Sequence, residues 1–157
     1  MDFWRHQQTW MELLTGRRSC RKWHRFRDEE LLSAVSQCIE AAATAPSSCD
    51  RKAISTIFMQ DSPLVDSLVG GVGFLRAAPY IDAFVADMTA YGDRPEAAFM
   101  PYLDGGAAVM NFLTMAAVLG LGCCWVNPSG AHDFFAPQRL ISVVGVGYPA
   151  ESWPSHG

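Results

Sequence analysis

The residues best suited to chemistry gather in one short basic stretch. Residues 17–22 read Arg-Arg-Ser-Cys-Arg-Lys. The chain as a whole is acidic, with 12 Lys and Arg residues against 16 Asp and Glu residues and a formal net charge of -4. Guanidinium groups beside a serine hydroxyl match the oxygens of phosphate, so this stretch predicts a site for a compact phosphorylated anion. Half of the 12 basic residues lie between positions 17 and 27, namely Arg17, Arg18, Arg21, Lys22, Arg25 and Arg27.

A second polar stretch follows one predicted helix later. Residues 45–52 read Ala-Pro-Ser-Ser-Cys-Asp-Arg-Lys. Its proline and serines are typical of a helix end. Taken alone, each stretch also has an ordinary structural interpretation: the first as a solvated basic loop, the second as a simple stop signal.

Composition and charge argue against several classes of protein. The acidic balance disfavours general nucleic-acid binding. Residues 1–6 contain no apolar run, so no secretory signal is expected. The apolar stretch at 99–126 contains Asp104, Asn111 and several glycines. It is therefore interpreted as a core helix running into a strand, and no membrane span is expected.

The cysteines predict a reduced, cytoplasmic protein without a metal site. Their number is odd, and neither a Cys-x-x-Cys pair nor a His–Cys cluster with zinc spacing occurs. Free thiols fit a reducing compartment, so they are interpreted as small structural side chains. They are Cys20, Cys38, Cys49, Cys123 and Cys124.

Periodicity predicts an α+β fold in one domain spanning residues 1–157. Helices come first, strands interrupted by helices follow, and no repeat or linker separates them. Gly16 is a stop for the first helix, and the acidic residues 28–30 favour the start of the second. Helices are predicted at 5–15, 28–43, 63–68 and 96–119, with entry to the last near Pro101, and strands at 54–59, 80–88, 123–126 and 140–146.

The long helix is the least ordinary predicted element, because it is apolar almost all round. Half of the chain's residues are hydrophobic and only 18% are charged. A helix of this kind must be covered on several sides. In so small a chain a second subunit is the expected cover, so we predict a homodimer. The predicted core face comprises Leu103, Ala107, Met110, Asn111, Thr114 and Ala117.

Four segments, taken in order, resemble signatures of the FMN-dependent nitroreductases. Residues 17–23 are similar to the family's Arg-Arg-Ser-x-Arg-x-aromatic opening, and residues 42–53 to its Ala-x-x-Ala-Pro-Ser-x-x-Asn-x-Gln-Pro segment. Residues 104–125 resemble its long helix and Gly-Leu-Gly-x-x-Trp turn. Residues 144–151 resemble its closing strand and Gly-Tyr-Pro-x-Glu. The resemblance spans nearly the whole chain.

The resemblance implies an α+β homodimer, with an antiparallel-type sheet flanked by helices and two FMN sites at the subunit interface. It also implies electron transfer from NADH or NADPH to FMN and then to a nitro compound, quinone or similar acceptor, in ping-pong fashion. The protein supplies positioning and electrostatics while the flavin carries the electrons. No side chain is assigned a catalytic role, because solvent can protonate the acceptor.

The resemblance also distributes the cofactor-binding roles. Arg17 and Ser19, with Arg18, match the phosphate site, and Arg21 matches the position that reaches the ribityl chain or the pyrimidine side of the ring. A second set matches the segment from the other subunit that lies along the ring: Pro46, Ser47 and Ser48. A third set matches the turn near the ring's far side: Gly120, Gly122 and Trp125.

Departures from the family pattern affect the same segments. Asp50 stands where the family has Asn, and Lys52 stands where it has Gln. An ionised acid donates no hydrogen bond and adds negative charge beside the flavin. Lys52 either pairs with Asp50 or faces the pyrimidine edge. The sequence ends soon after Gly-Tyr-Pro, where relatives continue with basic residues, and only His156 remains.

Two alternatives remain open at this point. The departures favour a dimeric flavin-binding or flavin-handling module with little turnover. The other alternative is a dimeric scaffold whose basic stretch binds a different phosphorylated ligand. The physiological acceptor and the choice between NADH and NADPH are not predicted by the sequence.

Overall fold

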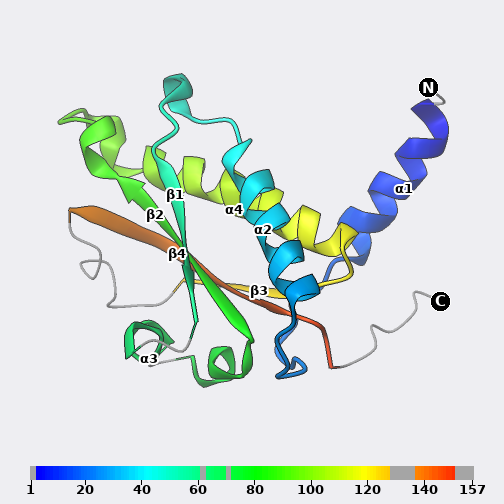
Figure 1. Cartoon of the computed structure of the whole chain (residues 1–157). Helices are drawn as coiled ribbons and strands as arrows, with labels where there is room; N and C mark the ends of the chain where they lie inside the picture. The colour runs from blue at the N-terminus through cyan, green and yellow to red at the C-terminus, as the bar shows by residue number, and fades with distance from the viewer. Residues whose placement is uncertain (1–2, 61–62, 70–71, 128–136, 151–157) are drawn as a thin grey trace.

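The computed structural model describes residues 3–60, 63–69, 72–127 and 137–150, and it contains one sheet with helices on both faces (Figure 1). The helices are α1 (Phe3–Gly16), α2 (Glu29–Ala43), α3 (Pro63–Val69) and α4 (Met100–Val118). The strands are β1 (Ile54–Met59), β2 (Tyr80–Asp87), β3 (Gly122–Val126) and β4 (Gln138–Gly147). Short 3-10 turns are η1 (Ser48–Asp50), η2 (Gly73–Ala77), η3 (Met88–Ala90) and η4 (Pro95–Ala98).

The sheet has the strand order β1-β2-β4-β3, and all neighbours are antiparallel. Its central strands β2 and β4 are buried along nearly their whole length. One register row runs from Phe58 through Asp82 and Val144 to Trp125. The antiparallel α+β prediction is therefore confirmed.

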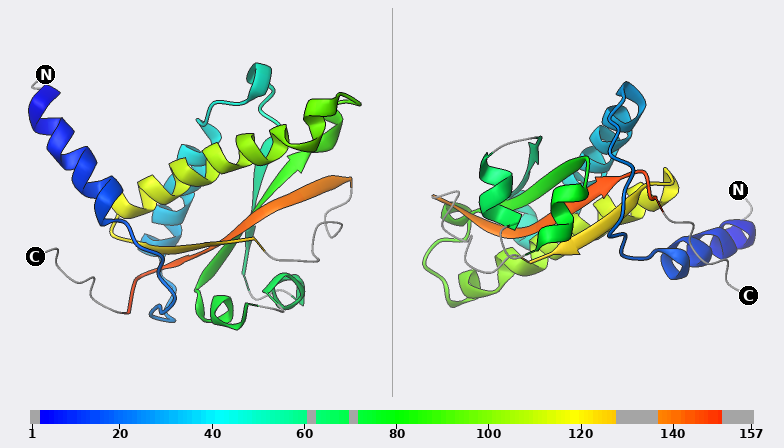
Figure 2. Two further views of the ribbon diagram at one scale, coloured as in Figure 1. Left: turned by 180° about the vertical axis from the view of Figure 1, so that it is seen from behind. Right: turned by 90° about the horizontal axis from the view of Figure 1, so that it is seen from below.

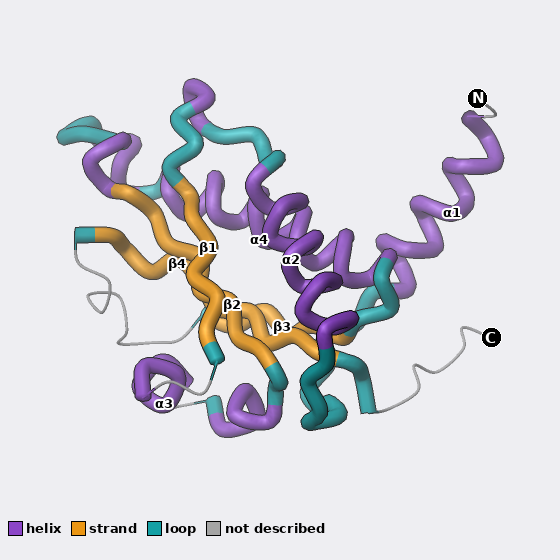
Figure 3. The backbone as a smooth tube through the Cα atoms, in the orientation of Figure 1, coloured by secondary structure: helices purple, strands orange, loops and turns teal. Residues whose placement is uncertain are grey.

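Two apolar cores lie on the two faces of the sheet. Helices α2 and α4 cover one face, while α3 and η2 lie against the other (Figure 3). Alternation along a strand sends successive side chains to opposite faces. In β2, for example, Tyr80 and Phe84 enter the α2/α4 core, whereas Ile81 and Val85 enter the other.

Helix α2 forms as its sequence predicts. The Asp28 carboxylate accepts a hydrogen bond from the backbone N–H of Leu31 at 2.7 Å and so caps the first turn. The helix buries one stripe at helical spacing, comprising Leu31, Val35, Cys38 and Ala42.

The predicted core face of α4 is wrong. Leu103 is 61% exposed and Met110 is 40% exposed. The buried residues are Pro101, Asp104, Gly105, Ala108, Val109, Phe112, Leu113 and Ala116. Apolar periodicity could not choose the face, because α4 is apolar nearly all round. The buried face of α4 is instead set by close packing against β4. A Cβ on Gly105 would lie 2.5 Å from Cγ2 of Ile141, so only glycine allows this approach.

Helix α1 ends at Gly16 as predicted, but it projects away from the body of the protein near the end of α4 (Figure 2). Trp10, Met11 and Leu14 are each more than half exposed. The described residues therefore leave the apolar side chains of α1 without a covering surface.

The remaining boundaries differ from the sequence prediction by small amounts. Strand β2 ends at Asp87 because Met88 begins η3, and residues 95–98 form η4 before α4 starts at Met100. Pro101 occupies the first turn of α4, where its missing N–H leaves no bond unmade. Along the described residues, no helix combines the length and apolarity that crossing a membrane requires.

Candidate functional site

The basic segment, residues 17–23, is held by backbone contacts to β3 and to the residues that follow β4. Ser19 forms a parallel bridge with Cys123 on β3, and the N–H of Cys20 donates to the carbonyl of Cys123 at 2.8 Å. Further along, Trp23 bridges Pro149, and its indole N–H donates to the carbonyl of Gly122 at 2.8 Å. The segment is therefore an anchored, extended stretch, and the solvated-loop interpretation does not describe it.

The anchored backbone buries some side chains of the basic segment and exposes others. Cys20 and Trp23 are buried, while Ser19 and Arg21 are exposed and Arg17 is half-buried. Within the described part of the chain, the Arg17 guanidinium makes no hydrogen bond or ion pair. The Arg21 guanidinium lies 5.8 Å from the ring centroid of Phe74. Both arginines therefore keep donors available for an anion.

The buried Cys124 thiol of β3 lies near the basic segment. Burial raises the pKa of the Cys124 thiol, while the Arg21 and Arg17 guanidinium groups and a side-chain hydrogen bond with Ser19 lower it. Ser19 thus contacts Cys124, and the charges of Arg17 and Arg21 are near enough to act on it. A guanidinium group and a hydroxyl on one short stretch, as Arg17 and Ser19 provide, form a donor set suited to a dianionic phosphate.

Arg18 behaves differently from its neighbours. One of its terminal nitrogens donates to the carbonyls of Thr15 at 2.6 Å and Arg17 at 3.1 Å. It thereby satisfies carbonyl groups at the C-terminal end of α1. In this structure the charge of Arg18 is directed mainly to the helix end.

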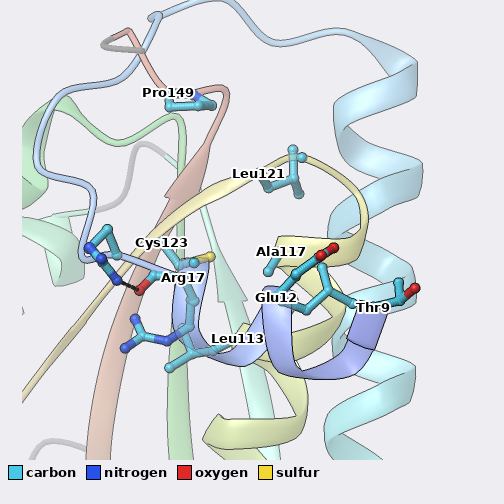
Figure 4. A pocket seen from close by; sticks show the side chains of 12 residues that line it. Thr9, Glu12, Arg17, Leu113, Ala117, Leu121, Cys123 and Pro149 are labelled. Carbon is cyan, nitrogen blue, oxygen red and sulfur yellow. Dashed lines mark hydrogen bonds between the residues drawn. The ribbon is translucent and has the colours of Figure 1, made fainter. Parts of the chain in front are cut away.

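A pocket of about 400 Å³ lies beside the basic segment, between α1 and the end of α4 (Figure 4). Arg17, Arg18 and Glu12 supply its charged groups. Its apolar walls are formed by Leu13, Leu113, Ala117, Leu121 and Pro149. Charged residues at one edge of a mostly apolar hollow are typical of a ligand site.

The second predicted segment, residues 45–52, is called here the serine turn. Its Ser48 N–H and hydroxyl both donate to Oδ1 of Asp104, at 2.9 and 2.8 Å. The hydroxyl of Tyr91 donates to the other carboxylate oxygen, Oδ2, at 2.8 Å. Burial, followed by this bond and the charge of Asp104, raises the pKa of Tyr91, so its hydroxyl is kept as a donor. Asp104 therefore fixes the turn to α4.

Asp50 and Lys52 form an ion pair. Nζ of Lys52 lies 3.1 Å from Oδ1 of Asp50. The sequence predicts that Lys52 either pairs with Asp50 or faces the pyrimidine edge, and in this structure it pairs with Asp50. Cys49, Asp50 and Lys52 all have positive φ angles, near 50°. Such angles are uncommon outside glycine, and here they turn the chain sharply between Ser48 and β1.

Several residues of the serine turn line one shallow hollow of about 250 Å³. Pro46, Ser47 and Lys52 lie at its edge with Asp104. The Ser47 hydroxyl accepts a hydrogen bond from the N–H of Lys52 at 3.0 Å, which holds both residues in the turn.

The basic segment and the serine turn lie at opposite ends of α4. The serine turn contacts Asp104 near its start, whereas the pocket beside the basic segment contacts Leu113 and Ala117 near its end. At roughly 1.5 Å per helical residue, Asp104 and Ala117 are separated by about 20 Å along the axis. One chain therefore does not bring the two segments into one site.

Gly122 packs against the basic segment, whereas Trp125 lies apart from both segments. A Cβ on Gly122 would lie 2.7 Å from the sulfur of Cys20 and 3.2 Å from Cβ of Pro149, so glycine here admits neighbouring segments of the same chain. Trp125 is partly exposed and lines a separate hollow with Tyr102 and Ile141. Gly120 has a φ angle of +72° and ends α4 in the left-handed region.

The cysteine prediction holds for four of the five thiols. Cys20, Cys38, Cys123 and Cys124 are free and buried, whereas Cys49 is exposed. Burial, with a contribution from the nearby Asp82, raises the pKa of Cys38 to about 12. A thiol with a raised pKa stays protonated near neutral pH and is therefore a poor nucleophile.

Asp82 is an unusual buried acid on β2. It is completely buried, and neither carboxyl oxygen has a hydrogen-bond partner among the described residues. Burial raises the pKa of Asp82 well above its ordinary value. The hydroxyl of Ser142 on β4 is also buried without a partner there. Both groups weaken the fold, because buried polar atoms normally require partners.

Sequence patterns did not identify the residues that support the serine turn. Asp104 accepts from Ser48, Tyr91 donates to Asp104, and a guanidinium nitrogen of Arg51 donates to the Ser48 carbonyl at 2.9 Å. The available signal was Asp104 itself, a lone acid in an otherwise apolar helix, since a buried charge needs partners.

Comparison with known proteins identifies the family of this chain. A sequence model described as the Nitroreductase family matches residues 58–148, more than half of the chain. The chain belongs to the nitroreductase family. Membership identifies it in general terms as a flavin oxidoreductase. No protein of curated function matches this nitroreductase significantly in sequence.

Solved structures share the fold of this nitroreductase at low sequence identity. A candidate NADH oxidase from Clostridium acetobutylicum is 25% identical, with a TM-score of 0.75 over 90% of this chain and 89% of its own. A candidate nitroreductase from Desulfovibrio desulfuricans, solved in complex with FMN, is 23% identical, with a TM-score of 0.78 over 94% and 90%. An FMN-dependent nitroreductase from Clostridium difficile R20291 is 22% identical, with a TM-score of 0.76 over 94% and 91%.

Proposed function

We propose that residues 1–157 form one FMN-binding domain that works as a homodimeric NAD(P)H-dependent oxidoreductase. When bound, FMN supplies the redox chemistry, passing electrons from NADH or NADPH to a nitro compound, quinone or similar acceptor in a ping-pong order. The observation that carries this proposal is the backbone anchoring of the basic segment to β3, which holds Ser19 beside Cys123 and leaves the Arg17 guanidinium without a hydrogen bond or ion pair among the described residues.

The donor set of the basic segment fits the phosphate of FMN. The Arg17 guanidinium and the Ser19 hydroxyl supply directed hydrogen bonds to a dianion. The backbone bonds that join residues 19 and 20 to Cys123 preorganise these side chains. Arg21, the exposed cation farther along, is assigned to the ribityl chain or the pyrimidine side, where it offsets negative charge.

The other half of the site comes from the serine turn of a second copy. This assignment follows from the separation of about 20 Å along α4, which keeps the turn away from the phosphate residues of its own chain. Pro46, Ser47 and Ser48 then present hydroxyl and backbone groups to the ring. Asp50 and Lys52 approach as a neutral pair, so the acid does not add a net charge beside the flavin.

A second copy also has a surface to cover. The outer face of α4 exposes Leu103, Met110 and Val118, and α1 exposes Trp10, Met11 and Leu14. Burying apolar surface is the main driving force for association. A dimer that covers these helices accounts for both the exposed residues and the divided site.

Anaerobic titration of the purified protein tests the proposal. We expect a yellow protein, or one that takes up added FMN, whose flavin absorbance bleaches when NADH or NADPH is added. A protein that binds FMN but is not reduced by either nicotinamide supports the alternative of a flavin-binding module with little turnover. A colourless protein that takes up no FMN contradicts both. Light scattering measures the dimer, and a stable monomer contradicts the divided site.

A further inference from the structure

We propose that a pocket between the serine turn and the start of α4 binds the carboxylate of a small aromatic electron acceptor. The pocket holds about 220 Å³ and is called here the guanidinium pocket. Its lining residues include Ser48, Arg51, Tyr91, Arg94, Glu96 and Met100. The inference rests on the proposed function, because it names the class of acceptor that this site favours.

The guanidinium pocket is lined by more positive than negative side chains. The described lining contains two guanidinium groups, Arg51 and Arg94, and one carboxylate, Glu96. Arg94 is exposed and makes no hydrogen bond or ion pair with a described residue. The pocket therefore keeps a net positive charge in a protein whose formal net charge is -4. A guanidinium with free donors suits a carboxylate, which accepts two parallel hydrogen bonds.

Preorganisation is the second argument. Arg51 is held on two sides: one terminal nitrogen donates to the Ser48 carbonyl at 2.9 Å, and its guanidinium carbon lies 5.6 Å from the ring centroid of Tyr91. Arg51 is therefore already ordered before a ligand binds, and Arg94 is not. The entropic cost of ordering side chains on binding falls mainly on Arg94.

The walls and volume indicate the rest of the ligand. The ring of Tyr91 and the side chains of Ala97 and Met100 give the pocket an apolar side. Drug-sized ligands occupy pockets of roughly 300 Å³ or more. A pocket of about 220 Å³ suits a single aromatic ring carrying one acid group.

The position of the guanidinium pocket connects it to the proposed flavin site. The Ser48 hydroxyl lies 3.1 Å from the sulfur of Met100, which lines this pocket, and donates at 2.8 Å to Asp104. Asp104 lines the neighbouring hollow together with Ser47 and Lys52. The Ser48–Asp104 hydrogen bond therefore joins a lining residue of one cavity to a lining residue of the other. A carboxylate held by Arg94 would place its ring beside the residues proposed to face the flavin.

The first experiment compares two acceptors of the same shape. The FMN-loaded protein is assayed with NADH and either 4-nitrobenzoate or the neutral 4-nitrobenzyl alcohol. Arg94→Gln is expected to lower kcat/KM about tenfold for the acid and to leave the alcohol within about twofold, since a charge-assisted hydrogen bond is lost. The control is Arg76→Gln, which removes an exposed arginine paired with Asp66 on the other face of the sheet. An equal fall for both acceptors contradicts the proposal.

A second experiment separates this inference from the proposed function. Fluorine NMR measures 4-fluorobenzoate binding to the full chain without added FMN, in wild type, Arg94→Gln and Arg76→Gln. Weakening of about tenfold in Arg94→Gln alone supports the pocket, even if the protein shows no turnover. Equal affinities in all three proteins overturn it. A raised KM for NADPH but not NADH in Arg94→Gln, with both acceptors affected alike, would assign the site to the nicotinamide's phosphate and also overturn it.

Discussion

The hydroxyl of Ser48 donates to the carboxylate of Asp104 at 2.8 Å and so ties the serine turn to the first half of α4. The Ser48 N–H bonds the same oxygen at 2.9 Å. These bonds cross 56 residues of sequence and bind the turn to a rigid helix. A segment built to meet a cofactor in another subunit requires such support from its own chain.

The first prediction concerns the buried carboxylate of Asp104. Asp104→Asn should reduce the free energy of unfolding by about 1–3 kcal/mol, because the amide cannot accept all three hydrogen bonds from Ser48 and Tyr91. It should also weaken FMN binding, because the serine turn loosens. Urea denaturation and a flavin titration measure the two effects. Tyr91→Phe is the matched control and should cost about 1 kcal/mol, since it removes one of the bonds. Equal effects of the two variants would contradict the assigned role of Asp104.

The second prediction concerns the phosphate. Arg17→Gln should weaken FMN binding about 10- to 100-fold, as expected for the loss of a charge-assisted hydrogen bond. Riboflavin, which lacks the phosphate, should bind wild type and variant alike. Arg18→Gln is the control: its guanidinium is engaged with the Thr15 and Arg17 carbonyls, so its effect on FMN should be smaller. Fluorescence quenching of each flavin gives the affinities. An equal loss for riboflavin would place Arg17 elsewhere.

The third prediction concerns the Asp50–Lys52 pair. Lys52→Gln should lower the reduction potential of bound FMN, because Asp50 then faces the flavin without its counter-charge. Asp50→Asn should raise it. Both residues are exposed, so either change should alter stability by less than about 1 kcal/mol. Potentiometric titration measures the reduction potential of bound FMN in each variant. Shifts of the same sign in Lys52→Gln and Asp50→Asn would contradict this prediction.

The fourth prediction concerns the pH dependence of stability. Burial raises the folded-state pKa of Asp82, while the unfolded state keeps a value near 3.9. A raised folded pKa gives stability that is fully present below the unfolded value and is lost as pH rises through the folded one. The free energy of unfolding should therefore fall as pH rises from about 4.

Asp82→Asn tests this directly. The variant should resemble wild type at pH 4 and be increasingly more stable than wild type as the pH rises, because the amide does not titrate. Thermal melts across the pH range measure the difference. A constant difference at every pH would show that Asp82 does not titrate as described.

Sequence patterns could predict those elements that local chemistry defines. Asp28 caps α2, Gly16 ends α1, and residues 54–59 form β1 with the predicted bounds. In each case the decisive interactions lie within a few residues of chain, so periodicity and capping rules suffice.

Long-range packing accounts for what the sequence could not predict. The buried face of α4 depends on Ile141, a partner far along the chain that Gly105 admits. The partners of Asp104 are Ser48 and Tyr91, which only the folded chain brings together. Likewise, Gly122 contacts Cys20 and Pro149 across the sheet edge. Residues 151–157, including His156, and the segment 128–136 lie outside the described residues.

The most direct test of the divided site is complementation between two defective chains. Arg17→Glu damages the phosphate half, and Ser47→Tyr blocks the turn half. Each variant alone should bind FMN poorly. Mixed and allowed to exchange subunits, they form heterodimers in which one site takes Arg17 from one chain and Ser47 from the other, both intact, so about a quarter of all sites should recover. Recovery of FMN binding on mixing is the predicted result, and a mixture that binds no better than the separate variants would contradict the two-copy site.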